Sequence, residues 1–410
     1  MEVLYPRCAG IDVHKQSVSV CVLTPGQGAD PRKEIRQFGT MTGELHQLAE
    51  WLREMRVSHA AMESTGVYWK PVFNILESAC DLILVNARDI KQVPGRKTDK
   101  ADCAWIASLL RHGLLKASFV PPPEVRELRD LCRSRTTLVR DSVTVGNRLR
   151  KVLEDANIKL DSVASDCLGT SGRAMIDALI GGEQDPLQLA KLARGRLKSK
   201  LAELVSALEG KVTAHHRFLL QEAMRQLRFL EDQIARFDEE IERHMPPFEW
   251  ALSLLITMPG VDRVAASALL GEIGCDMTRF PSARHLASWA GLCPGNNESA
   301  GRSRSGKSHR GNQWIRGLMT EIAWAASRTK NTYASAFYRR LVTHRGKKRA
   351  IVALANASIQ AVWHILTDRQ KYHDLGPNYF DRLRSADQTN NLVKRLKKLG
   401  YEVTLQHNAA

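Results

Sequence analysis

The chain lacks the features that would place it outside the cell or in a membrane. Its eight cysteines are scattered, and no two have the C-x-x-C spacing of a zinc or redox site. The segment from Met1 to Arg7 lacks the basic-then-apolar order of a signal peptide. The apolar segment from Ala350 to Leu366 is interrupted by polar residues, which is typical of a buried helix. These absences predict a cytoplasmic protein with reduced thiols and no membrane contact.

Acidic residues are the other shortage. The chain has 44 Asp and Glu against 60 Lys and Arg, which gives a formal net charge of +16 over 410 residues. Such an excess indicates an anionic partner, and nucleic acid is the first candidate. Ribosomal and membrane-surface proteins share this charge, but neither class needs the carboxylates described below.

The order of predicted elements indicates an α/β fold for residues 1–120. Two strands are expected in 7–24, and a third in 34–40. Further strands end at Glu63 and Asn86, and helices are expected at 42–55, 69–79 and 99–112. Strands followed by alternating helices and strands are typical of such layer folds. Three prolines at 121–123 mark a boundary.

Residues 121–247 are predicted to be basic helices and a coiled-coil region. A long basic helix is expected over 124–160, followed by a loop at about 161–186. A heptad pattern then runs through Leu220, Leu227, Ile234 and Ile241. It fits a helical hairpin within the chain and a coiled coil between chains equally well.

Residues 248–372 are predicted to form a mainly α-helical domain, and 373–410 a polar, basic tail. A helix, a Pro-Gly turn and an Ala-rich helix over 251–274 resemble a helix-hairpin-helix, whose amides can hold a DNA phosphate. Asp262 replaces the usual second glycine, so a purely structural hairpin is at least as good an interpretation.

Four carboxylates have the setting of a metal-dependent nuclease centre. Asp12 lies in a strand-like stretch and Glu63 ends another, while Asp99 and Asp102 begin a predicted helix and share one face of it. Hard oxygen ligands from separate elements can hold Mg²⁺ ions that act on a phosphate. Acidic residues at a helix start also occur simply because they favour the helix dipole.

Three strings carry a family resemblance. Residues 10–15 read GIDVHK, 63–66 read ESTG, and 97–102 read KTDKAD. They resemble the DEDD motif of the IS-one-ten (IS110) family of insertion-sequence transposases. That resemblance implies an RNase H-like, RuvC-like N-terminal domain in which Asp12, Glu63, Asp99 and Asp102 bind Mg²⁺.

A serine near the C-terminus is the candidate nucleophile. Ser299 lies in a small polar loop followed by arginines, where a hydroxyl could attack phosphorus and leave a phosphoserine. By itself the loop leaves Ser303, Ser305 and Ser308 as alternatives. The run from Gly291 to Gly301 resembles the family's serine transposase domain, whose nucleophile directly follows a glutamate, and this resemblance selects Ser299.

Basic side chains near these motifs are candidate nucleic-acid contacts. They are Arg96, Lys97, Lys100, Arg302, Arg304, Lys307, Arg310, Arg316, Arg339, Arg340, Lys347 and Lys348. A solvated basic surface is the alternative interpretation of such clusters.

The resemblance implies a site-specific recombinase that a structured RNA, the bridge RNA, guides to donor and target DNA. It further implies a homodimer or homotetramer, associated with the nucleoid when bound to DNA. Two alternatives stay open. The chain could be a RuvC-like, Mg²⁺-dependent junction nuclease without serine chemistry, or a non-catalytic regulator that binds RNA or DNA.

Overall fold

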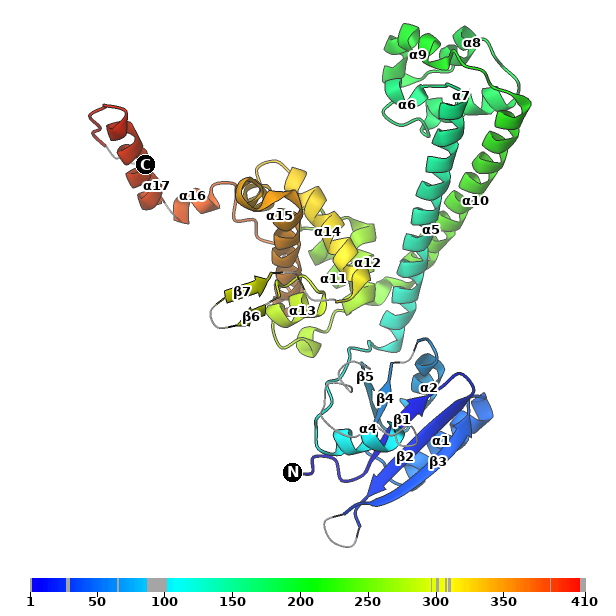
Figure 1. Ribbon diagram of the computed structural model, residues 1–410, viewed down its shortest axis with the longest axis vertical. Helices are drawn as coiled ribbons and strands as arrows, with labels where there is room; N and C mark the ends of the chain where they lie inside the picture. Colours follow the sequence, from blue (N-terminus) through cyan, green and yellow to red (C-terminus); the bar gives the residue numbers. More distant parts are fainter. Residues whose placement is uncertain are drawn as a thin grey trace. The chain divides into compact units, whose positions relative to one another are not determined.

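The structure is a computed structural model that forms two compact units, Met1–Val120 and Pro121–Ala410. It describes residues 2–26, 30–64, 66–86, 102–295, 297–299, 302–306, 308, 311–383 and 385–405. For 297–299, 302–305, 381 and 385–388 it describes the backbone. Each unit is considered by itself below (Figure 1).

The first unit is built on a mixed five-stranded sheet with the order β3-β2-β1-β4-β5. The pairs β1–β2 and β2–β3 are antiparallel, whereas β1–β4 and β4–β5 are parallel. The strands are β1 (Cys8–Val13), β2 (Ser17–Thr24), β3 (Arg32–Gly39), β4 (His59–Glu63) and β5 (Asp81–Val85). The predicted strands are therefore confirmed, and so is the α/β class of this unit.

Helices cover both faces of this sheet. Side chains alternate between the faces of a strand, so Ile11 belongs to the core shared with α1 (Thr42–Glu54) and α2 (Trp69–Leu76). Cys8 instead belongs to the core beneath α4 (Asp102–Arg111) on the other face. The part of the expected helix before Asp102 lies outside the described residues.

The second unit begins with two long antiparallel helices. The first is α5 (Pro123–Asp155) and the second is α10 (Ala214–His244), and they run side by side (Figure 1). His216 at the start of α10 contacts Asp155 at the end of α5, at 3.0 Å. The apolar heptad positions of α10 thus pack on the same chain, as the hairpin interpretation predicts.

The predicted loop at 161–186 is wrong, because that stretch contains a buried helix. Met175, Ile176 and Leu179 recur at helical spacing and are almost fully buried in the core beside α5 and α10. The Gly, Ser and Asp content suggested a loop, but the packing of this apolar face decides the structure. The helices here are α6 (Leu160–Val163), α7 (Thr170–Ile180), α8 (Pro186–Lys191), a 3-10 turn at Gly195–Lys200 and α9 (Leu201–Leu208).

The rest of the second unit is helical apart from one two-stranded sheet. It comprises a 3-10 turn at Pro246–Phe248, α11 (Glu249–Leu255), α12 (Arg263–Ile273), a 3-10 turn at Met277–Arg279, α13 (Ala283–Trp289), β6 (Asn297–Ser299), β7 (Arg302–Ser305), α14 (Gln313–Arg328), α15 (Tyr333–Asp368), α16 (Tyr379–Leu383) and α17 (Ser385–Lys398). The last two occupy the segment expected to be a polar tail.

Among the described residues, α15 is the single helix long and apolar enough to cross a membrane. Its buried side chains, including Leu354, Ile359 and Val362, belong to the face that packs on α13 and α14. It is therefore a core helix, as predicted for 350–366. Its regular geometry breaks at Gly346, where φ is 74° and ψ is 164°.

The helix-hairpin-helix-like segment is formed by α11 and α12. Gly260 at its turn has φ of +83°, and a Cβ there would lie 2.5 Å from the carbonyl oxygen of Ile322 in α14. Asp262 caps α12 by accepting a hydrogen bond from the Ala265 amide at 2.7 Å. The turn is thus packed against α14 and its carboxylate is used as a cap, which favours the structural interpretation over phosphate binding.

Candidate active site

Asp12 and Glu63 lie next to each other at the same edge of the sheet. The parallel strands β1 and β4 pair Ile11 with Met62, so the following position on each strand carries one of the two carboxylates. Side chains alternate between the two faces of a strand, so residues two or four apart share a face. Cys8, four positions before Asp12, and Ala61, two before Glu63, both pack beneath α4, so the two carboxylates lie on that face as well. The two carboxylates therefore share an edge and a face.

Asp102 begins the helix that covers this face. Gly10 in β1 meets the backbone of α4 at Cys103 and Ala107, so any side chain at Gly10 would collide with the helix. The far end of α4 is fixed where the Arg111 carbonyl accepts a hydrogen bond from the Leu4 amide at 2.9 Å. The helix thus runs back along β1, and its first turn, with Asp102, lies toward the Asp12 end.

The Asp12 carboxylate is mostly buried and acts electrostatically on its neighbours. Its side chain is 20% exposed and lies 3.1 Å from Nε2 of His14, which is largely exposed. Burial raises the pKa of the nearby Cys103 thiol, and the Asp12 carboxylate raises it further. A cation at this edge would be attracted by the same charges.

The described residues contain no group of three or more His, Cys, Asp or Glu side chains gathered closely enough to hold a metal ion. Asp99, the fourth predicted ligand, lies outside the described residues, as do the neighbouring Arg96, Lys97 and Lys100. In the described part of the chain, Asp12, Glu63 and Asp102 therefore lie toward the same end of the sheet, but they do not form a complete set of metal ligands.

Ser299 ends β6, the first strand of a short antiparallel hairpin in the second unit. The register pairs Glu298 with Ser303 and Ser299 with Arg302, and it is irregular near Asn297. The predicted nucleophile thus lies in a β-hairpin. Arg302 and Arg304 both belong to its second strand, β7.

The other predicted nucleic-acid contacts fall into two groups. Lys307 and Arg310 lie outside the described residues. The remaining five lie on helices: Arg316 is half-buried on α14, whereas Arg339, Arg340, Lys347 and Lys348 are exposed on α15. The exposed lysines directly follow the break at Gly346.

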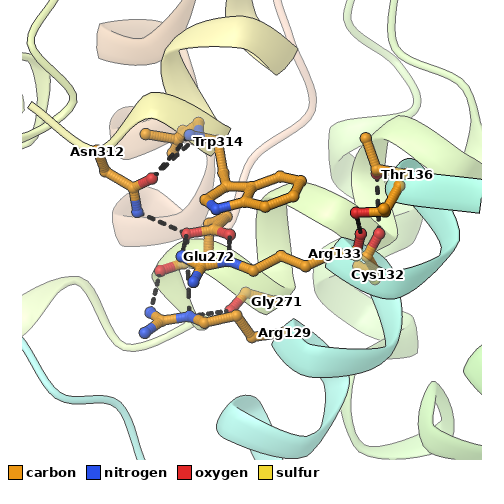
Figure 2. A network of polar contacts seen from close by, with 10 residues as sticks. Arg129, Cys132, Arg133, Thr136, Gly271, Glu272, Asn312 and Trp314 are labelled. Atoms are coloured by element: carbon orange, nitrogen blue, oxygen red, sulfur yellow. Dashed lines mark hydrogen bonds and ion pairs between the residues drawn. The ribbon is translucent and has the colours of Figure 1, made fainter. Parts of the chain in front are cut away.

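A buried carboxylate that sequence reasoning missed is the centre of a polar network in the second unit (Figure 2). Glu272 in α12 is 4% exposed. Its two oxygens accept hydrogen bonds from Nε and Nη2 of Arg133 in α5, at 2.7 and 2.9 Å. Arg129 donates to the backbone carbonyls of Gly271 and Glu272, at 3.0 and 2.6 Å. Asn312 donates from Nδ2 to Oε2 of Glu272 at 2.6 Å.

The network is desolvated. Burial lowers the pKa of Arg129 to about 10, although the Glu272 charge opposes the shift. Burial likewise raises the pKa of the Cys132 thiol to about 12, with Glu272 adding to it. The guanidiniums of Arg133 and Arg140 lie 5.3 and 5.0 Å from the centre of the Trp314 ring, within cation–π range.

The sequence did carry a faint signal of this network. Glu272 is the one charged residue in the run from Val264 to Ile273, and Arg129 and Arg133 are four apart on a basic helix. Nothing local pairs them, since more than 130 residues separate Arg133 from Glu272.

Two models of transposase families match the sequence. A family model of IS110-type DEDD transposases, described as "Transposase", matches residues 9–158. A second, described as "Transposase IS116/IS110/IS902 family", matches residues 252–339. The two matches together cover more than half of the chain.

Two relatives are similar along most of the chain, and a third is similar over a shorter part. A probable family 20 transposase from Pseudomonas aeruginosa is 24% identical over 88% of this chain and 97% of its own length. The transposase for insertion sequence element IS1111A from Coxiella burnetii is 23% identical, over 89% and 91% respectively. A pilin gene-inverting protein from Moraxella lacunata is 34% identical over 21% of this chain and 31% of its own.

Among solved structures, RuvC from Thermus thermophilus aligns with 27% of this chain and 99% of its own, with 15% identity and a TM-score of 0.22. The two family matches make this chain a transposase, an enzyme class that cuts and rejoins DNA. It belongs to the IS110 family.

Proposed function

We propose that the chain is a site-specific recombinase that cuts and rejoins DNA through a covalent bond to Ser299. The observation that carries this proposal is the placement of Asp12 and Glu63 side by side, on the face covered by the helix that Asp102 begins. The domain with these residues is proposed to be RNase H-like and RuvC-like. Acidic residues at one edge of a sheet suit phosphate chemistry. Ser299 supplies a nucleophile on the protein, which plain hydrolysis by water would not need.

The serine step is a balanced phosphoryl transfer. The Ser299 hydroxyl oxygen forms a bond to the scissile phosphorus while the bond from phosphorus to a DNA oxygen breaks. The serine proton passes, overall, to that departing oxygen, which becomes a free DNA hydroxyl. The phosphoserine keeps the energy of the phosphodiester, so the reverse attack by a DNA hydroxyl rejoins a strand.

The carboxylates of Asp12, Glu63, Asp99 and Asp102 fit Mg²⁺ by their chemistry, since that ion prefers hard oxygen ligands. When bound, Mg²⁺ would offset the charge of the phosphate. The part played by the chain itself is to hold the phosphate in place for attack. Arg302 and Arg304, on the strand paired with β6, are suited to offset charge that develops on the phosphate.

The basic side chains are proposed to hold donor DNA, target DNA and a structured guide RNA. The exposed Arg339, Arg340, Lys347 and Lys348 support this role, because exposed cations can reach a phosphate backbone. A homodimer or homotetramer in the cytoplasm, associated with the nucleoid when on DNA, is part of the same proposal.

Ser299→Ala tests the nucleophile directly. The full chain would be incubated with Mg²⁺, a supercoiled plasmid that carries the DNA flanking its gene, and RNA transcribed from that DNA. Protein linked to DNA would be trapped by rapid denaturation. We expect an adduct with the natural chain and with Ser303→Ala, the matched control on β7, and none with Ser299→Ala.

Each alternative function predicts a different outcome. A junction nuclease that uses water would cut DNA without an adduct, and Ser299→Ala would leave its cutting intact. A non-catalytic regulator would leave the plasmid uncut, with no effect of Asp12→Asn, Asp102→Asn or Mg²⁺. Full recombination by Ser299→Ala would refute the proposal.

A further inference from the structure

The segment that carries the β6–β7 hairpin has both of its ends held at one place. It leaves α13 through Gly291 and returns to α14 through Gly311. The two glycines meet backbone to backbone, since a Cβ on Gly311 would lie 2.6 Å from the Ala290 carbonyl carbon. The Asn312 amide then donates to the carbonyl oxygen of Trp289 at 3.3 Å. Movement of Asn312 would therefore move the base of the hairpin segment.

The side chain of Asn312 is fixed by three hydrogen bonds. Its Oδ1 caps α14 by accepting from the amides of Trp314 and Ile315, at 2.9 and 3.4 Å. Its Nδ2 donates to Glu272 at 2.6 Å. Because one end of the amide is an acceptor and the other a donor, only one orientation satisfies both neighbours.

Glu272 is itself held in place from α5. The bidentate contact with Arg133 fixes the plane of the carboxylate. Arg129 holds the adjacent backbone through its hydrogen bonds to the carbonyl oxygens of Gly271 and Glu272. A buried ion pair is a poor means of stabilising a core, because well-packed apolar residues often do as well or better. Polar groups of this kind can instead select one arrangement of the elements that they join.

We propose that Glu272 is a positioning residue for the hairpin that bears Ser299. It acts through Asn312: Arg133 fixes the carboxylate, the carboxylate fixes the Asn312 amide, and Asn312 fixes the point at which the hairpin segment returns to α14. The position of the hairpin is thereby tied to α5. The part of this inference that concerns catalysis rests on the proposed role of Ser299, whereas the structural part does not.

Asn312→Asp separates the contact with Glu272 from the capping of α14. Aspartate caps a helix as well as asparagine does, but it has no amide to donate and it places a second negative charge beside Glu272. Asn312→Ser is the companion variant, since serine also caps, adds no charge and is too short to reach. Combining Asn312→Asp with Glu272→Gln reverses the direction of this donor–acceptor pair. The new amide nitrogen takes the place of Oε2 and gives up the hydrogen bond from Nη2 of Arg133, whereas Oε1 keeps the bond from Nε.

The first measurement is hydrogen–deuterium exchange of the amides at 297–305 in the full chain without DNA. The net loss of a hydrogen bond to a charged group corresponds to an effect of roughly tenfold or more. We therefore expect the hairpin amides to exchange roughly tenfold faster in both Asn312 variants and at a rate between that of Asn312→Asp and the natural rate in the combined variant. Asp276→Asn is the matched control, because Asp276 caps a separate 3-10 turn, bonds Thr278 and takes no part in the network.

The second measurement is the rate of adduct formation on the plasmid described above. It should fall roughly tenfold in the Asn312 variants and recover in part in the combined variant, with plasmid binding unchanged in all of them. A residue that merely stabilised the core would not show recovery by a reversed pair of equal charge.

The inference is overturned if both Asn312 variants exchange like the natural chain, or if the combined variant stays as fast as Asn312→Asp. If exchange responds as expected and Ser299→Ala still forms an adduct, the nucleophile is wrong and the positioning of the hairpin stands. If exchange responds and the adduct rate does not, the role of Glu272 in catalysis is refuted.

Discussion

Gly10 sets how closely α4 approaches the sheet. Its missing side chain lets the backbone of α4 at Cys103 and Ala107 lie directly against β1, two residues from Asp12. Burial on both sides of the strand leaves no room for the helix to retreat without opening the core around Cys8 and Ala61. The absence of a side chain at Gly10 thus determines where α4, and with it Asp102, lies against the sheet.

Gly10→Ala should therefore destabilise the first unit and displace Asp102. Overpacking of a tight core costs about 1–3 kcal/mol, and chemical denaturation of the full chain would measure it. Gly43→Ala is the control, since a Cβ there meets nothing within 4 Å and alanine favours helix α1 by about 0.5–1 kcal/mol. Equal stability of the two variants would contradict the close approach described here.

The thiol of Cys132 reports on the Glu272 network. Burial raises its pKa to about 12, so at pH 8 it is almost wholly protonated, and only the thiolate reacts with alkylating reagents. Unfolding returns the pKa to its ordinary range near 8.5.

Iodoacetamide at pH 8 should therefore leave Cys132 unlabelled in the native chain and label it in denaturant. Peptide mapping by mass spectrometry would measure both states. The half-buried Cys293 is the internal comparison and should be labelled first. Rapid native labelling of Cys132 would show that the network opens.

At the scale of elements, periodicity predicted much of the fold and packing decided the rest. The apolar runs at Cys8–Val13 and His59–Glu63 form the strands that they indicate. The heptad pattern of α10 predicted a helix but not its partner, because the same apolar stripe can pack on another chain. The helix α7 was missed because its few large apolar residues lie among small and polar ones, and only their burial against α5 and α10 makes the helix evident.

The candidate site likewise contains residues that sequence motifs predicted and one that only the packing reveals. Motif strings predicted Asp12, Glu63 and Asp102 at strand and helix ends, and these positions follow from local structure. Glu272 depends on contacts with Arg133 and Asn312, which lie 139 and 40 residues away in the sequence. No local pattern specifies a contact of that kind.

Leu227→Ala tests the α5–α10 pairing. Leu227 is 3% exposed, so truncation should cost about 2–5 kcal/mol, measured as a loss of thermal stability that is independent of protein concentration. Phe229→Ala is the control, because Phe229 is 61% exposed. A loss that vanished on raising the concentration would instead indicate a coiled coil between chains.

At the scale of the whole molecule, the net charge of +16 governs association with nucleic acid. Each phosphate contact releases bound counterions, so affinity falls as salt rises. The cations beside Gly346 are exposed and are suited to such contacts. Lys191 on α8 is also exposed but lies far from them in the sequence.

Lys347→Ala should weaken binding of plasmid DNA uniformly across sequences. The slope of log affinity against log salt should become shallower by about 0.9, the value for one lost contact with duplex DNA. Fluorescence anisotropy across a salt series would measure it. Lys191→Ala should keep the natural slope, and an unchanged slope in Lys347→Ala would remove that lysine from the DNA interface.

The family match over residues 9–158 does not stop where the first compact unit stops, at Val120, but continues through the whole of α5. The helix α5 therefore belongs with the first unit in the family match and with the second unit in its packing. Exchange of halves between two relatives after residue 158 would join an α5 from one parent to an α12 from the other, whereas exchange after Val120 would take both helices from one parent. In a chimera joined after residue 158, Arg133 and Glu272 would come from different parents, so their pairing would test whether the two halves are compatible.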